Sequence, residues 1–252
     1  IMSVFNEENR VCYAIDSILN QIYKNWELII VNDASTDNTL KKIKNIAKKN
    51  NRIKIINNKK NIGLAASLNR AILLSKGEFI ARMDADDISF NERLKLQVDY
   101  LDLNKKIVVL GGGALYKKNN SKFFKKVLMP ENHNDILKWL LRSSPFIHSS
   151  VMMRKSFLHL TKGYNVSLKR GQDYDLWFRG KYLGEYYNFQ FPIVKYTFEE
   201  KKSLQSIIDS FHIRHRNITS IKKKIISMLW LFVAVIKRVY IILIDILYKK
   251  RK

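Results

Sequence analysis

The sequence predicts an α/β chain with a mainly parallel sheet flanked by helices, followed by an amphipathic helical extension at the C-terminus. Three observations support this prediction. Apolar runs alternate with helix-spaced apolar residues over the first hundred positions, turn-forming residues end the runs, and the last fifth is both basic and apolar. With 252 residues, 46% hydrophobic and 27% charged, the chain is too apolar to be disordered or collagen-like.

The first hundred residues are expected to alternate strand and helix. Leu28-Ile29-Ile30-Val31 is a continuous apolar run, typical of a strand covered on both faces. We expect strands at 1–5, 28–31, 53–56, 79–83 and 107–110, and helices at 11–22, 40–47, 64–72 and 94–101. Gly77 is expected to cap the third helix. This alternation implies βαβ units, whose ligands bind beyond the carboxyl ends of the strands.

Beyond Asp87 the pattern loosens. The strand at 107–110 is expected to end at Gly111-Gly112-Gly113, which no helix with Lys-Ser/Thr follows, so a phosphate-binding P-loop is excluded. A tight turn or a bulge is the favoured interpretation. Residues 123–200 mix short strands and helices and resemble an appended substrate-facing half, not a second independent domain. We therefore expect one domain over 1–200 and a separate segment over 201–252.

A single cysteine, Cys12, excludes an internal disulfide and any cysteine zinc site, and it suits a reducing cytoplasm. No secretory leader precedes the first predicted strand. The sequence opens at Ile1 inside an apolar run, so we expect a native N-terminal piece to precede it.

The charge is strongly positive, at +24, and attracts polyanions: nucleic acid, anionic lipid or phosphorylated small molecules. Residues 201–252 hold thirteen Lys/Arg and two Asp/Glu, a net +11, beside the most apolar segment of the chain. This distribution favours a membrane surface over DNA.

The sharpest local signal is Asp84-Ala85-Asp86-Asp87, directly after the apolar run 79–83. Three carboxylates in four residues repel one another, and a divalent cation such as Mg²⁺ or Mn²⁺ would relieve that repulsion. The alternative is an N-cap cluster for the helix that contains Arg93 and Leu94.

Two other predicted strands end at the same sheet edge, at Phe5-Asn6 and Asn32-Asp33. An aromatic ring beside a carboxylate suits a nucleobase, because the ring stacks and the carboxylate accepts a base N–H. The alternatives are a buried Phe5 and a turn-forming Asp33.

A further cluster spans 170–179, where Leu176, Trp177 and Phe178 predict a helix anchored in the core. Asp173 would lie at its start, where a carboxylate beside a cleft acts as a general base. The competing interpretations are helix capping for Asp173 and an exposed charge for Asp175. For His148, a hydrogen bond within the core is favoured over contact with a substrate phosphate.

Together these segments resemble glycosyltransferase family 2, the inverting enzymes with the nucleotide-sugar-binding GT-A fold, a Rossmann-like α/β architecture. The resemblance covers roughly residues 1–185 and rests on five motifs in order. They are Ser3-Val4-Phe5-Asn6-Glu7-Glu8, Glu27-Leu28-Ile29-Ile30-Val31-Asn32-Asp33-Ala34-Ser35-Thr36-Asp37, Asn61-Ile62-Gly63-Leu64, Asp84-Ala85-Asp86-Asp87 and Gln172-Asp173-Tyr174-Asp175-Leu176-Trp177.

The resemblance implies transfer from a nucleoside diphosphate sugar, most often a UDP-sugar, by a nucleotide-sugar half at about 1–110 and an acceptor half at about 111–200. It also implies roles for seven residues: donor binding by Ser3, Phe5, Asp33 and Asp84, Mn²⁺ or Mg²⁺ binding by Asp86 and Asp87, and general-base catalysis by Asp173.

The chain departs from the family pattern at three places. Gln172 replaces the usual Glu, Phe5 replaces a frequent Tyr, and a phosphate-contacting arginine is missing near 61–64, where Lys59 or Lys60 would substitute.

Residues 225–248 form an apolar stretch flanked by lysines, long enough as one helix of about 36 Å to span a bilayer. Its polar residues Ser227, Arg238 and Asp245 fall, together with Ala234, on one stripe at helical spacing, and both flanks are basic. A helix lying in the membrane interface is favoured over a span, and a dimer helix is the third alternative.

The leading hypothesis is a cytoplasmic glycosyltransferase, peripheral on the inner face of the cell membrane, acting in surface polysaccharide biosynthesis on a glycan or lipid-linked acceptor. A metal-dependent nucleotidyltransferase is the second hypothesis, but no separate phosphate-gripping loop is found. A non-catalytic nucleic-acid-binding protein is the third, and it lacks a basic-aromatic module. Nucleic acid is therefore not an expected partner.

Overall fold

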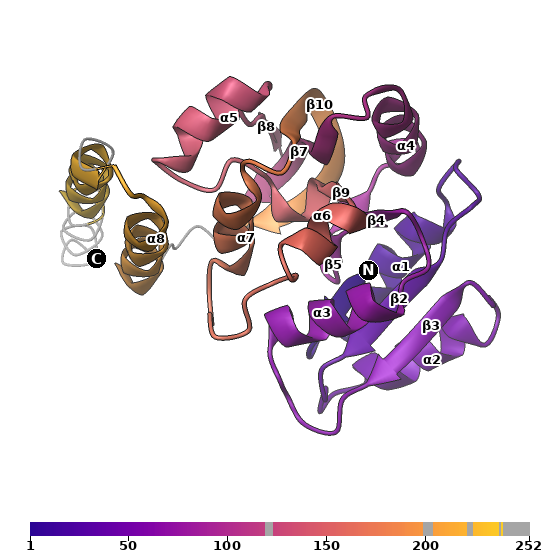
Figure 1. Cartoon of the computed structure of the whole chain (residues 1–252). Helices are drawn as coiled ribbons and strands as arrows, with labels where there is room; N and C mark the ends of the chain where they lie inside the picture. The colour runs from indigo at the N-terminus through magenta and orange to yellow at the C-terminus, as the bar shows by residue number, and fades with distance from the viewer. Residues whose placement is uncertain (119–122, 199–203, 221–223, 237, 239–252) are drawn as a thin grey trace.

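The structure is a computed structural model that describes residues 1–118, 123–198, 204–220, 224–236 and 238. Within these residues the chain forms two sheets with helices packed against them (Figure 1). The sheets meet at residues 81–83, where an edge strand of one sheet runs directly into an edge strand of the other. The strands of the first sheet are β1 (Met2–Val4), β2 (Leu28–Asn32), β3 (Ile53–Asn57) and β5 (Met83–Asp84). Its helices are α1 (Val11–Leu19), α2 (Thr39–Ala47) and α3 (Leu64–Leu74).

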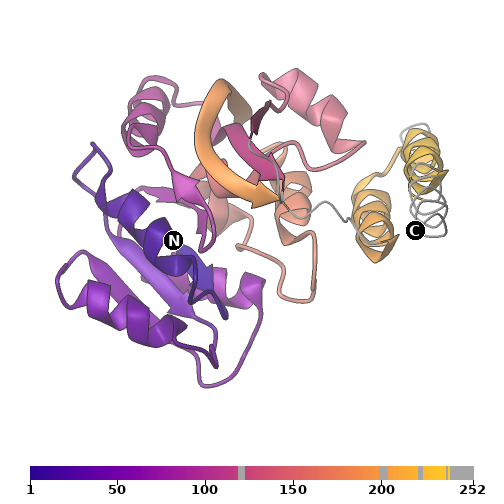
Figure 2. The same ribbon diagram turned by 180° about the vertical axis from the view of Figure 1, so that it is seen from behind.

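The first sheet has the order β3-β2-β1-β5, and its strands are parallel. Alternate residues of β2 point to opposite faces. Leu28 and Ile30 join the cluster formed with α1 and α2, whereas Ile29 and Val31 pack with Ala71 of α3. Figures 1 and 2, which view opposite sides, show α3 on one face of this sheet and α1 and α2 on the other. Burial on both faces explains why β2 is a continuous apolar run.

The predicted strand 79–83 is in fact two strands in two sheets. β4 (Phe79–Ala81) pairs antiparallel with β9 (Met152–Arg154), whereas β5 pairs with β1. Arg82 lies at the crossing point, and its backbone N–H donates to the carbonyl of Val151. The prediction of one strand was wrong because a hydrophobic run carries no sign of a change of partner.

The second sheet has the order β4-β9-β7-β10-β6, with β8 paired to β7. Its remaining strands are β6 (Ile88–Ser89), β7 (Ile107–Lys118), β8 (Phe124–Val127) and β10 (Glu185–Phe198). The other helical elements are α4 (Arg93–Leu103), α5 (His133–Leu140), η1 (His148–Ser150), α6 (Lys155–Leu160), α7 (Gln172–Gly180) and α8 (Leu204–Asn217).

The triple glycine lies inside β7 and does not end a strand, so this part of the prediction was wrong. Two of the three register shifts of the β7–β10 pair occur opposite Gly112 and Gly113, on either side of Pro192 of β10, so the predicted irregularity is present. A Cβ on Gly112 would lie 2.6 Å from Ile193 Cδ1. These glycines therefore serve close packing of two long strands.

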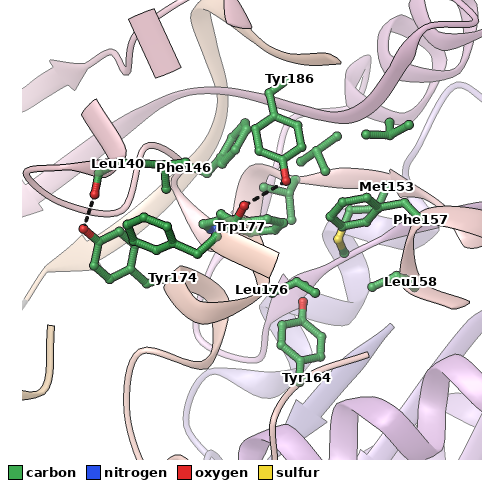
Figure 3. Packing of buried hydrophobic residues seen from close by; sticks show 14 of the residues in the cluster. Leu140, Phe146, Met153, Phe157, Leu158, Tyr164, Tyr174, Leu176, Trp177 and Tyr186 are labelled. Carbon is green, nitrogen blue, oxygen red and sulfur yellow. Dashed lines mark hydrogen bonds between the residues drawn. The ribbon is translucent and has the colours of Figure 1, made fainter. Parts of the chain in front are cut away.

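The core beside the second sheet is built around α7. Trp177 is fully buried, and the rings of Phe146 and Trp177 have centroids 5.0 Å apart. Figure 3 shows the Tyr186 hydroxyl donating to the Trp177 carbonyl and the Tyr174 hydroxyl donating to the Leu140 carbonyl. The predicted core anchoring of 176–178 is confirmed.

Other predicted helix ends shift by a few residues. Gly77 does not cap α3, because the helix ends at Leu74 and its C-cap residue is Ser75, whose backbone is extended. At the C-terminus, 224–236 and 238 are helical, while the rest of the predicted 225–248 helix, including Asp245, lies outside the described residues.

Candidate active site

The carboxyl ends of β1, β2 and β5 form one rim. Ser3 of β1 pairs with Val31 of β2 on one side and with Asp84 of β5 on the other. The backbone N–H of Asp33 donates to the Val4 carbonyl at 2.8 Å. Parallel pairing therefore brings together residues that lie up to 81 positions apart in the sequence.

Phe5 follows β1 and remains 46% exposed. The next residue, Asn6, has a left-handed backbone with φ of 54° and is held by the 35–36 turn. Its N–H donates to Ser35 Oγ at 3.0 Å, and its Oδ1 accepts from the Thr36 N–H at 2.8 Å. The alternative of a buried Phe5 is wrong, because this turn holds the ring at the surface of the rim.

Asp33 is buried and already accepts three hydrogen bonds. Its Oδ1 accepts from Asn58 Nδ2 at 2.7 Å and from the Ile62 N–H at 2.9 Å, and its Oδ2 accepts from the Gly63 N–H at 2.8 Å. The carboxylate therefore anchors the 58–63 loop. An ionised carboxylate offers about four acceptor positions, so Oδ2 retains acceptor capacity on this rim.

The acidic triplet lies directly beyond β5. Carboxylate oxygens of Asp84, Asp86 and Asp87 all lie within 4.8 Å of one another. The capping interpretation is wrong, because β6 separates these residues from α4, whose N-cap residue is Glu92. The three carboxylates form a cluster of hard oxygen ligands.

Two neighbours hold the triplet in place. Buried Arg82 donates to both oxygens of Asp84 and to Ser149 Oγ at 3.1 Å. Ser149 Oγ in turn donates to Asp84 Oδ2 at 2.7 Å, and it also contacts Asp87. Asp84 is therefore largely occupied by protein donors, whereas Asp86 has one ion pair, with exposed Arg10 at 3.3 Å.

Burial and neighbouring charge raise the pKa values of two carboxyl groups of the triplet. Burial, and then the charge of Asp84, raise the pKa of Asp87 to about 7. The same two causes raise the pKa of Asp86. Carboxyl groups that resist ionisation because of like charges gain most from a divalent cation, and oxygen ligands suit Mn²⁺ or Mg²⁺. The donor set therefore fits such a cation, with Asp86 and Asp87 the more available ligands.

Asp173 lies in the first turn of α7 and accepts from Ser144 Oγ at 3.0 Å. Burial raises its pKa, which hydrogen bonds from its own N–H, the Tyr174 N–H and Ser144 partly offset. The N-cap residue is Gly171, so Asp173 is not the cap.

Asp173 and the triplet share electrostatic neighbours. Arg82, which binds Asp84, also interacts electrostatically with Asp173 and lowers its pKa. After burial, the charges of Asp173 and Asp84 also raise the pKa of Tyr164. His148, adjacent to Ser149, hydrogen-bonds Tyr164 Oη at 2.8 Å. The charge of Arg82 therefore acts on both Asp84 of the triplet and Asp173 of α7.

Three further predictions can be compared with the structure. His148 hydrogen-bonds within the core, as predicted, and burial lowers its pKa well below its usual range. Asp175 is fully buried between two arginines, so its interpretation as an exposed charge was wrong. Gln172, the first residue of α7, is buried and donates to the Leu168 carbonyl at 3.1 Å, in the loop that precedes this helix.

Sequence reasoning missed four polar residues that organise the site: Arg82, Ser144, Ser149 and Tyr164. Arg82 carries one usable signal, a charge inside an apolar run two residues before an aspartate. The other three have no local signal. Ser149 meets the triplet from more than 60 residues away, and Ser144 lies 29 residues before Asp173. Lys59 and Lys60 are exposed on the 58–63 loop that Asp33 anchors.

Comparison with known proteins identifies the class to which this fold and site belong. A family model for glycosyl transferase family 2 matches residues 1–160, and the chain belongs to that family. The predicted family resemblance is confirmed.

Curated relatives carry the same designation. The chain is 41% identical over 182 residues to a putative glycosyltransferase EpsE of Bacillus subtilis, covering 71% of this chain and 64% of that protein. It is 37% identical over 181 residues to the O-antigen biosynthesis glycosyltransferase WbnJ of Escherichia coli, covering 71% and 69%. The alignment thus spans less than two thirds of the length of EpsE.

Solved structures share the fold. TarS of S. aureus, crystallised with UDP, has a TM-score of 0.68 at 20% identity and covers 92% of this chain and 69% of that chain. The mannosyltransferase PcManGT of Pyrobaculum calidifontis, in complex with GDP-Man and Mn²⁺, has a TM-score of 0.66 at 17% identity, covering 91% and 68%. The predicted GT-A-type α/β fold is confirmed.

Proposed function

We propose that this protein transfers a sugar from a nucleoside diphosphate sugar, most simply a UDP-sugar, to a hydroxyl group of a glycan or lipid-linked acceptor, with inversion at the anomeric carbon. The observation that carries the proposal is the rim on which an exposed aromatic ring, a buried carboxylate and an acidic triplet are gathered, with Arg82 beside the triplet acting electrostatically on Asp173. Solved relatives that bind UDP, UDP-GlcNAc and GDP-Man support this donor class.

In this proposal the donor lies across residues 1–110 and the acceptor approaches from residues 111–200. Ser3 and Phe5 contact the uracil and ribose, with the exposed Phe5 ring stacking on the base. Asp33 accepts the base N–H with its remaining acceptor capacity, while its other bonds keep the 58–63 loop beside the nucleotide.

Asp86 and Asp87 would hold the divalent cation, Mn²⁺ or Mg²⁺. Asp84 contributes less to the cation because Arg82 and Ser149 already bind its oxygens, and it orients the cluster instead. When bound, the cation would neutralise charge that develops on the departing diphosphate. Arg10, paired with Asp86 at the edge of the site, adds positive charge on the same side.

In this proposal Asp173 is the general base. The acceptor oxygen forms its bond to the anomeric carbon as the bond from that carbon to the diphosphate oxygen breaks on the opposite face. The hydroxyl proton passes to the Asp173 carboxylate, and nucleoside diphosphate leaves. A pKa raised by burial brings the carboxylate closer to working pH, which strengthens it as a base.

We further propose that the C-terminal helix rests on the anionic inner face of the cell membrane. Ser227, on the polar stripe, faces the protein and is buried, whereas the opposite side is apolar and exposed. The exposed apolar residues are Ile225, Met228, Leu229, Phe232, Val233 and Ile236. Within the described residues, none of the helices combines the length and apolarity needed to cross a bilayer. An apolar face within a segment of net charge +11 suits an anionic lipid surface.

The decisive experiment has two parts. Calorimetric titration with UDP and GDP, each with and without Mn²⁺, tests donor and cation binding, and duplex DNA is the control ligand. Mass spectrometry of products from a panel of UDP- and GDP-sugars, with a membrane lipid extract as acceptor source, tests transfer.

We expect UDP binding that depends on Mn²⁺ and a product heavier than its acceptor by one sugar. Tight binding of DNA with no effect of UDP would overturn the proposal in favour of a nucleic-acid-binding protein. Release of free sugar alone would show a hydrolase.

A further inference from the structure

Helix α8 contacts the helix that carries Asp173 through ion pairs centred on a buried carboxylate, with the Arg216 side chain of α8 55% exposed. Asp175 of α7 has a side chain only 1% exposed. Its Oδ2 accepts from Arg179 Nε at 2.7 Å, and its Oδ1 accepts from Arg216 Nη2 at 2.5 Å. Arg179 belongs to α7 itself, so Arg216 is the contact that comes from outside the helix. It stands 41 residues later, at the end of α8.

A second contact fixes the start of α7. Gly171, its N-cap residue, has φ of 70°, the left-handed conformation that favours glycine. Ile213 of α8 is buried against it so closely that a Cβ on Gly171 would lie 2.6 Å from Ile213 Cδ1. Asp173 lies two residues beyond this contact and two residues before Asp175. The catalytic turn is therefore held at both ends by α8, which lies beside α7 in both views (Figures 1 and 2).

Helix α8 is itself anchored to the rest of the molecule. Buried Arg214 donates from Nη1 to the Arg142 carbonyl at 2.8 Å and from Nε to Ser227 Oγ at 3.1 Å. The Arg142 guanidinium lies 4.6 Å from the ring centroids of both Trp139 and Trp230. The helix at 224–236 and the end of α5 thus keep α8 in place against α7.

We propose that α8 is a positioning element of the active site and that Arg216 is a positioning residue that acts through Asp175 on Asp173. The inference rests on the proposed function of Asp173 and adds a C-terminal element to it. Arg216 lies beyond the part of the chain that the family model matches, which ends at 160, so the contact belongs to the extension and not to the matched region.

The physical reason is that a buried carboxylate needs its partners. Without Arg216, one oxygen of Asp175 loses its charged donor in a water-poor place, and the first turn of α7 relaxes to restore hydration. Asp173 moves with that turn. A displacement of about 1 Å at a reacting group can lower a rate by ~10²-fold, whereas the nucleotide rim at the first sheet is built without α8.

The experiment compares Arg216→Gln, Arg216→Lys and His215→Ala, an exposed neighbour on the same helix. Turnover is measured with the donor and acceptor for which the wild-type enzyme forms product. We expect Arg216→Gln to lower kcat by ten- to a hundredfold, with KM for the donor and the stoichiometry of UDP binding unchanged. Arg216→Lys should recover kcat to within about threefold of wild type, and His215→Ala should match wild type.

The pH profile separates positioning from a loss of folded protein. Loosening of the turn admits water to Asp173 and reverses the burial that raises its pKa, so the acid limb of the kcat profile in Arg216→Gln should move to lower pH. An Arg216→Gln enzyme with lower kcat, reduced UDP stoichiometry and an unmoved acid limb would show a structural role only. Wild-type kcat and profile in Arg216→Gln would overturn the inference alone, whereas an active Asp173→Asn would overturn the proposed base.

Discussion

At the residue scale, Asp87 is the member of the acidic triplet whose ionisation is most strongly opposed by its surroundings. Burial and the charge of Asp84 raise its pKa to about 7. Its folded-state pKa therefore lies above the unfolded value, so its contribution to stability is greatest at low pH and is lost as pH rises through about 7.

The first prediction concerns Asp87→Asn. In the absence of metal, its Tm should exceed that of wild type by several degrees at pH 8, at ~2–4 °C per kcal/mol, and the difference should vanish near pH 4. Mn²⁺ should raise the Tm of wild type more than that of the variant. Thermal unfolding across this pH range measures both effects. Asp99→Asn, an exposed residue paired with Lys95, should show neither.

The second prediction concerns Asp86→Ala. Asp86 forms an exposed ion pair with Arg10, so its loss should leave the fold intact while removing a cation ligand. We expect metal-dependent UDP binding to disappear, with little change in Tm. Calorimetry with and without Mn²⁺ measures this, and a fully active variant would contradict the assignment of Asp86.

The third prediction concerns Asp173 and its hydroxyl partner. Asp173→Asn should abolish transfer with UDP affinity nearly intact, and equal loss of both would make Asp173 a structural residue. Ser144 Oγ donates to the ionised carboxylate and lowers its pKa, so Ser144→Ala should raise that pKa further. The acid limb of kcat should then move to higher pH by on the order of one unit, since such a bond contributes ~1.5 kcal/mol.

These residues also show what a sequence can predict. Asp84, Asp86 and Asp87 are adjacent in the chain and follow an apolar run, so local pattern suffices to select them. Hydrogen bonds from Arg82 and Ser149 occupy Asp84 and so determine which carboxylates of the triplet remain available to a cation. The Ser149 bond joins η1 to β5 across more than 60 residues. Only the folded chain brings that contact about.

At the element scale, the same distinction explains the errors. The period of apolar residues predicted β1, β2, β3 and the first helices, because burial on one or both faces leaves a local pattern. It could not divide 79–83 between two sheets, since each half is buried and the change of partner depends on β1 and β9.

The fourth prediction concerns the close packing of β7 and β10. Gly112→Ala would press a methyl group against Ile193, and the neighbouring strand has a bulge there that fixes its position. We expect a loss of about 1–3 kcal/mol in the free energy of unfolding, as is usual for overpacking. Urea titration measures it, with exposed Lys126→Ala of β8 as the control. A stability equal to wild type would show that the strands can separate.

At the scale of the whole molecule, the first sheet supplies the rim that we propose for the nucleotide, and α7, beside the second sheet, carries the proposed base. The C-terminal helices contact α7 through Arg216 and the segment at Arg142 through Arg214. The excess of lysine and arginine is also concentrated in the C-terminal segment 201–252. In our proposal, an acceptor embedded in or attached to a membrane would therefore meet the base from the side on which the protein rests.

The fifth prediction tests that arrangement. Deleting 219–252 should move the protein from membrane to soluble fractions while a soluble acceptor is still glycosylated, but the deletion also removes Ser227 and Trp230, which support α8. The sharper variant is Leu229→Glu with Phe232→Glu, both on the exposed apolar face.

It should bind phosphatidylglycerol vesicles at least tenfold more weakly, because each apolar side chain contributes ~1.5–3 kcal/mol when buried, and UDP affinity should not change. Leu103→Glu, which changes an even more exposed leucine on α4, is the control and should bind vesicles like wild type. Vesicle co-sedimentation measures binding. Unchanged binding would exclude this face from the membrane contact, and a change in oligomeric state instead would show that a second copy covers it.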